Sequence, residues 1–144
     1  MEFIKFLGTA GARFVVMKQL RASGGVWFSY RDTNIIIDPG PGTIVRIAKS
    51  KPKLDVEKLD GIILTHRHLD HSGDINVVIE GITNGGFKKR GILFTTEDSI
   101  SKDPVILEYL RNYLEKIEIL KEKKEYRIKD IIFYTPIKND HSVE

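Results

Sequence analysis

The chain has 144 residues, of which 41% are hydrophobic and 30% charged, and its formal net charge is +3. This length fits a single domain, and this composition is typical of a globular protein rather than a disordered or fibrous one. No apolar run approaches the roughly 20 residues that cross a membrane, and residues 1–8 lack the pattern of a signal peptide. We therefore expect a cytoplasmic protein with no membrane partner.

The absence of cysteine limits the kinds of site that this chain can build. Disulfides and thiolate metal sites are both excluded. A transition metal must be held by imidazole and carboxylate groups, which suit zinc, iron or manganese.

The first third of the chain is predicted to be rich in strands. Runs of β-branched and aromatic residues predict strands at 2–7, 26–30 and 34–37. Residues 31–33 between the last two strands are expected to form a hairpin turn. The sequence Asp-Pro-Gly-Pro-Gly at 38–42 breaks this pattern, and residues 43–50 then predict a short helix.

The middle of the chain continues with helices and buried strands. After a polar connection at 51–58, the wholly apolar run at 61–64 is typical of a strand buried on both faces. Residues 74–83 carry apolar side chains at helical spacing, and the Asn-Gly-Gly sequence at 84–86 ends this helix. A further buried strand is predicted at 91–95.

The last third contains one predicted helix and three predicted strands. Apolar side chains fall on one stripe of a helix at 104–117, with Pro104 in the first turn, where proline is tolerated. Strands are predicted at 118–120, 125–128 and 131–135. Because strands and helices alternate along the chain, the expected fold class is α/β.

Three of the four histidines lie within six residues, directly after a predicted buried strand. His66 and His68 are two residues apart in extended chain, so their rings project to the same side and can hold one metal ion. Asp70 and His71 follow where the chain turns toward the next helix, within reach of a second ion. Gly73 is expected to relieve crowding in that turn. A charged turn without metal is the alternative, but this clustering favours a metal site.

The sequence His66-x-His68-x-Asp70-His71 matches the HxHxDH signature of the metallo-β-lactamase-fold superfamily, and the resemblance covers essentially the whole chain. Residues 35–40 resemble the earlier aspartate motif of that superfamily, and residues 6–11 resemble the branch that contains tRNA 3′-processing endonucleases and phosphodiesterase-like proteins. The resemblance implies an αββα sandwich, of which residues 1–144 would form mainly the N-terminal half. We therefore expect a hydrolase domain that is incomplete at its C-terminal end.

The resemblance also implies roles for individual residues. His66, His68 and His141 would hold the first metal, whereas Asp70 and His71 would contribute to the second. Asp70 would also act in catalysis, by orienting the attacking water or by moving a proton. For His141, an exposed terminal side chain is the alternative.

Asp38 belongs to the motif that precedes the histidines. By resemblance, it would orient a metal ligand or its loop from outside the coordination sphere. A turn or helix-capping role is the alternative. The remaining ligands of the superfamily would lie beyond Glu144, so we expect the isolated chain to have a crippled site.

Two divalent ions, with zinc favoured and manganese or iron as alternatives, would activate a water molecule for hydrolysis. The resemblance favours a phosphodiester substrate, such as a nucleotide or an RNA end. A lactone, ester or thioester hydrolase and a metal-binding module without turnover are the alternatives. The basic loop at 84–91 either meets phosphates or is a solvated turn. Because half a sandwich exposes apolar surface, a homo-oligomer is also possible.

Overall fold

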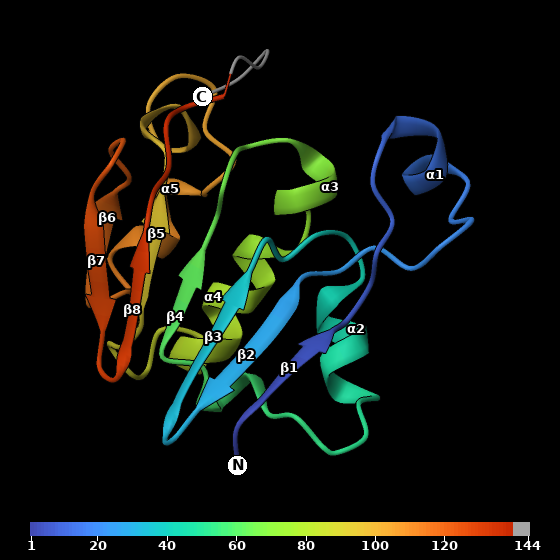
Figure 1. Ribbon diagram of the computed structural model, residues 1–144, viewed down its shortest axis with the longest axis horizontal. Helices are drawn as coiled ribbons and strands as arrows, with labels where there is room; N and C mark the ends of the chain where they lie inside the picture. The colour runs from blue at the N-terminus through green and yellow to red at the C-terminus, as the bar shows by residue number, and fades with distance from the viewer. Residues whose placement is uncertain (140–144) are drawn as a thin grey trace.

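The computed structural model describes residues 1–139, and its centre is a six-stranded sheet with helices on one face and a β-hairpin on the other (Figure 1). The sheet has the order β1-β2-β3-β4-β5-β6. Its strands are β1 (Phe3–Phe6), β2 (Val26–Tyr30), β3 (Thr33–Ile37), β4 (Gly61–Ile63), β5 (Ile92–Thr95) and β6 (Lys116–Ile119). The pairs β1/β2 and β2/β3 are antiparallel, and β3 through β6 are parallel.

The helices are short and mostly connect the parallel strands. They are α1 (Arg13–Met17), α2 (Thr43–Ala48), α3 (Leu69–Ser72), α4 (Ile75–Thr83) and α5 (Glu108–Arg111), with 3₁₀ turns at Val56–Lys58 and Glu97–Ser99. The strands β7 (Glu125–Ile128) and β8 (Ile131–Tyr134) form the hairpin, which is a separate two-stranded sheet. Within residues 1–139, every helix is too short or too polar to span a membrane.

Strand β4 is buried on both faces, as its apolar sequence predicts. On the helix side, Ile62 pairs with Ile36 of β3 and Leu93 of β5, and all three pack in a core that includes the apolar face of α4. On the hairpin side, Ile63 belongs to a second core whose buried members are Ile35, Ile63, Phe94, Tyr126, Ile128 and Ile131. The hairpin lies so close to β4 that a Cβ at Gly61 would be 2.5 Å from the Ile128 Cδ1 atom.

The parallel strands decide where a site can form. The carboxyl ends of β3, β4 and β5 meet at one edge of the sheet, where the connections at 38–42, 64–74 and 96–107 lie side by side (Figure 1). Such an edge is where open α/β sheets commonly bind ligands. The opposite edge carries the β7–β8 turn and the segment before β5.

Most elements agree with the sequence analysis to within two residues, but the predicted helix at 104–117 is wrong. Only α5 is helical in this region, because Leu107 has an extended conformation (φ −59°, ψ 134°). Residues 116–119 instead form β6, in which Ile117 pairs with Leu93 of β5. The helical spacing arose because Ile106, Leu110 and Leu114 all enter the core, and pairing with β5 overrides the local pattern.

Candidate metal centre

The three clustered histidines lie together at the carboxyl edge of the sheet. The chain leaves β4 at Ile63 and stays irregular until His68, which precedes the first residue of α3. The ring centroid of His66 is 5.0 Å from that of His68 and 4.1 Å from that of His71. The structure therefore brings together the three side chains that the motif predicted to be neighbours.

Asp38 reaches the histidines from the end of the neighbouring strand β3. Its Oδ1 atom accepts the backbone N–H of Thr65 at 2.7 Å, and its Oδ2 atom accepts the Thr65 hydroxyl at 2.7 Å. Oδ2 also lies 2.9 Å from Nδ1 of His71. Asp38 does not cap helix α2, whose N-cap residue is Gly42 and makes no side-chain cap. The contacts of Asp38 instead go to Thr65 and His71, as expected of a residue that orients the histidine segment.

The backbone at Asp38 has a positive φ of 51°, a conformation that only a few per cent of residues other than glycine adopt. This conformation turns the chain out of β3 and into the 38–42 segment. A Cβ at Gly40 would lie 2.1 Å from the carbonyl oxygen of Asp70, and a Cβ at Gly73 would lie 2.6 Å from the Pro41 ring. The two glycines let this turn pack directly against α3, as expected for Gly73.

Thr65, which the sequence pattern alone does not mark as functional, connects Asp38 to a second histidine. Its hydroxyl donates to Asp38 and lies 3.1 Å from Nδ1 of His66. Because the single hydroxyl proton is used, Nδ1 of His66 must be the donor in that contact. The network therefore leaves Nε2 as the accepting nitrogen of His66. The sequence does show a hydroxyl residue, Thr65, next to His66 after a buried strand. It could not show that Thr65 bonds to Asp38, because Asp38 is 27 residues away in the chain.

Asp38 also changes the acid–base behaviour of His71. The hydrogen bond from Nδ1 to the Asp38 carboxylate raises the pKa of His71 above its usual value, against the lowering effect of partial burial. The negative charges of Asp38 and Asp70 add to the increase. The edge of the sheet is thus an environment that favours a cation on or near this imidazole.

Asp38, His66 and His71 each offer one atom that could bind a metal ion, and these three atoms lie within 4.8 Å of one another. Both oxygens of Asp38 are already acceptors for protein donors, so the imidazoles are the better candidates for direct metal contact. Asp70 lies beside them, with its Oδ2 atom 3.5 Å from Nε2 of His71. Imidazole nitrogens with fixed Nδ1 partners and an adjacent carboxylate fit a divalent metal ion.

His68 is adjacent to His66 but falls outside the compact group formed by Asp38, His66 and His71. His141, the other expected ligand, lies outside the described residues. Arg67, between the two histidines, extends its side chain to residues 102 and 103.

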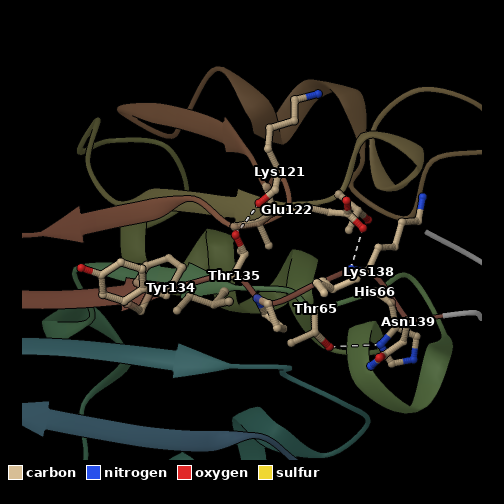
Figure 2. Close-up of a pocket in the computed structure, with 14 residues that line it drawn as sticks. Thr65, His66, Lys121, Glu122, Tyr134, Thr135, Lys138 and Asn139 are labelled. Carbon is tan, nitrogen blue, oxygen red and sulfur yellow. Dashed lines mark hydrogen bonds between the residues drawn. The ribbon is translucent and has the colours of Figure 1, made fainter.

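A cleft of about 750 Å³ opens next to His66. Its walls come from the ends of β4 and β6, from β8 and from residues 135–139; they include Ile63, Leu120, Phe133, Thr65, Thr96 and Lys121. Figure 2 shows His66 and Asn139 toward one end of the cleft and Tyr134 toward the other. A substrate group bound in this cleft would lie next to the histidines.

The basic loop at 84–91 lies at the other edge of the sheet, between the end of α4 and the start of β5 (Figure 1). Lys88 approaches Glu57 and Arg90 approaches Asp60, at 3.8 and 3.6 Å. The placement favours the alternative of a solvated turn over contact with a substrate at the histidines.

Comparison with known proteins identifies a family and two relatives of this chain. A model of the beta-lactamase superfamily domain matches residues 33–143. An uncharacterized protein of Methanocaldococcus jannaschii is 32% identical over 121 residues, which cover 81% of this chain and 45% of that protein. Ribonuclease Z of Borrelia garinii subsp. bavariensis is 29% identical over 136 residues, which cover 90% of this chain and 37% of that protein. The chain thus spans less than half the length of these curated relatives.

Solved structures share the fold at low sequence identity. The metallo-beta-lactamase fold protein YhfI from Bacillus subtilis has a TM-score of 0.57 and 21% identity, over 74% of this chain and 42% of that one. A diphosphatase from the PhnP family has a TM-score of 0.54 and 17% identity, over 79% and 42%. The short form of human tRNase Z has a TM-score of 0.52 and 21% identity, over 67% and 34%. These likenesses confirm the fold that the histidine motif predicted.

Proposed function

The chain belongs to the beta-lactamase superfamily, and from this premise we propose that the protein is a metal-dependent hydrolase of phosphodiesters, with a nucleotide or an RNA end as substrate. The observation that carries the proposal is the set of clustered imidazoles whose Nδ1 atoms are held by Asp38, directly at His71 and through Thr65 at His66. The substrate class is supported by two similar proteins, one named ribonuclease Z and one named a diphosphatase.

We assign the metal ligands to residues at the carboxyl edge of the sheet. In this proposal His66, His68, Asp70 and His71 hold two divalent ions, preferably zinc, with manganese or iron as alternatives. His141, which lies outside the described residues, is a further proposed ligand on the strength of its resemblance to the superfamily pattern. Such ions supply a hydroxide at neutral pH and neutralise charge on a phosphoryl oxygen.

The residues of this chain would prepare the site for that chemistry. Asp38 holds the Nδ1 proton of His71 directly and that of His66 through Thr65, so Nε2 would be the atom that each of these two imidazoles offers to a metal ion. Asp70, whose side chain is 21% exposed, would orient a water molecule or accept its proton. The cleft beside His66 would hold the part of the substrate next to the scissile bond, with Lys121 as a cation for a phosphate.

Two other functions remain as alternatives on the same scaffold. A lactone, ester or thioester hydrolase would use the same ligands, and the apolar lining at Leu120 and Phe133 suits an acyl group as well as a nucleobase. A metal-binding module without turnover would need only the ligands.

Hydrolysis assays on the full-length protein can separate these functions. The metal-stripped protein, reloaded with zinc or manganese, would be compared on bis-p-nitrophenyl phosphate, lactones and thioesters. We expect metal-dependent turnover of the phosphodiester. Turnover confined to lactones or thioesters would rule out the proposed phosphodiesterase function. The His68→Ala variant should lose metal and activity with little change in urea stability, so unchanged metal content would contradict the ligand assignment.

A further inference from the structure

Arg67 lies between two proposed metal ligands and makes an unusual set of contacts for an exposed edge. One terminal nitrogen of its guanidinium donates to the carbonyl oxygen of Lys102 at 3.0 Å, and the other donates to that of Asp103 at 2.7 Å. The second nitrogen also lies 3.1 Å from Oδ2 of Asp103. The side chain of Arg67 is only 21% exposed, whereas that of Asp103 is 92% exposed, so the arginine is held by the backbone of the opposing loop.

The segment that carries the histidines has few backbone partners of its own. Strand pairing with β5 stops after the bond from the Leu64 N–H to the Phe94 carbonyl, and the Thr65 N–H is bound by the Asp38 side chain. Beyond this point, Ser72 holds the carbonyl oxygens of Arg67 and His68. The Arg67 side chain provides the anchor on the side of the segment that faces residues 102 and 103.

The loop that receives Arg67 is itself fixed to the body of the fold. Asn76 of α4 donates from Nδ2 to the Val105 carbonyl and accepts the Leu107 N–H, both at 2.9 Å. The loop begins next to Thr96, which lines the cleft. Arg67 therefore bridges a loop at the cleft to the segment that presents the imidazoles.

We propose that Arg67 is a positioning residue that fixes the rotation of the segment from His66 to His68 and thereby sets the affinity and geometry of the metal centre. Arg67 stands between His66 and His68, whose ring centroids lie 5.0 Å apart, and its side chain is held at residues 102 and 103, so this anchor constrains the backbone that orients both imidazoles. The planar guanidinium donates to two successive carbonyl oxygens at once, which an ammonium group cannot reproduce in the same geometry. This inference rests on the proposed metal site but not on the identity of the substrate.

The test is a titration with Co²⁺, a spectroscopic substitute for zinc, on the metal-stripped full-length protein. Arg67→Ala should weaken Co²⁺ binding by about tenfold or more, as loss of groups that orient ligands commonly does, and should change the visible absorption spectrum. Arg67→Lys should recover only part of the affinity. Asp103→Asn should bind nearly as well as the unmodified protein, because both carbonyl contacts remain.

Arg111→Ala is the matched control. Arg111 also donates to a backbone carbonyl in this region, that of Ile106, but it does not touch the histidine segment. Its loss should lower urea stability without changing the Co²⁺ spectrum.

Two other outcomes are informative, because one would overturn the role of Arg67 and the other would overturn the metal site. Unchanged affinity and spectrum in Arg67→Ala, or affinity losses in Arg67→Ala and Arg111→Ala that follow their losses of stability, would overturn the role of Arg67. If Arg67→Ala does not fold, the same comparison between Arg67→Lys and Arg111→Ala decides. If the unmodified protein binds no Co²⁺, the proposed metal site itself is wrong.

Discussion

Two carboxylates at opposite ends of the parallel strands show how the same chemical group serves different purposes. Asp60, just before β4, has a side chain that is 7% exposed and contacts two cations, Arg90 and Lys129. Asp38, just after β3, has a side chain that is 17% exposed and contacts Thr65 and His71. The charge of Asp60 is neutralised by neighbouring side chains, whereas the charge of Asp38 acts on an imidazole.

This difference separates a structural edge of the molecule from a reactive one. At the Asp60 edge, permanent cations balance the carboxylate and leave no demand for a further ion. At the Asp38 edge, the carboxylate raises the pKa of His71, which means that the site favours positive charge. A divalent metal ion bound at the Asp38 edge would meet that demand.

The largest expected effect comes from Asp38→Asn. An amide has one accepting oxygen, so it cannot receive all three donors that the carboxylate now receives from Thr65 and His71. We expect metal affinity to fall by roughly 10–100-fold, the usual range for residues that orient ligands, with the fold retained. Calorimetric titration with zinc would measure this, and affinity equal to that of the unmodified protein would refute the role of Asp38.

Asp60→Ala should have the opposite profile. The Asn34 N–H loses its acceptor, at 2.9 Å in the structure, and Arg90 loses its counter-charge. Lys129, whose side chain is 58% exposed, can rehydrate, so we expect a loss of about 1–3 kcal/mol in the free energy of unfolding. Urea denaturation measures it, while zinc affinity should stay unchanged. A fall in zinc affinity without loss of stability would contradict the structural role of Asp60.

A smaller effect is expected from pH, through His71 in the metal-free protein. Its folded-state pKa is raised above the ordinary value of 6.5, so folding favours the protonated imidazole. The stabilisation is fully present below pH 6.5 and is lost as pH rises through the raised pKa. Asp38→Asn should flatten this dependence in urea denaturation. An NMR titration that places the His71 pKa at or below 6.5 would contradict it.

Protons and metal ions compete for the same imidazole, so metal binding should show the reverse trend. Zinc affinity is expected to fall as pH falls through the raised pKa of His71, because Nε2 then carries a proton. Zinc titrations at several pH values would measure this trend, and an affinity independent of pH would contradict His71 as a ligand.

The smallest effect is expected from the basic loop. Lys88→Ala combined with Lys89→Ala should change the free energy of unfolding by no more than about 0.5 kcal/mol, because the Lys88–Glu57 contact is largely exposed. Substrate KM should stay unchanged, since this loop lies at the Asp60 edge. Lys121→Ala is the matched control: it removes a cation that lines the cleft and should raise KM for a phosphodiester. A raised KM in the loop variant would restore the loop as a substrate contact.

The sequence by itself determined the features whose cause is local. Buried strand β4, helix α4 and the turn at 38–42 follow from a continuous apolar run, from helical spacing and from proline with glycine. The histidine cluster was visible for the same reason, since His66, His68 and His71 are close in the chain.

Only the tertiary structure decided the features that join distant segments. Ile117 lies in a strand rather than a helix because β5 offers it a pairing edge, which local spacing cannot reveal. The bond between Thr65 and Asp38 spans 27 residues, and the contact of Arg67 with Asp103 spans 36. Such contacts depend on parallel strands bringing their carboxyl ends together, so the histidine cluster was evident from the sequence, whereas the contacts that Thr65 and Arg67 make around it were not.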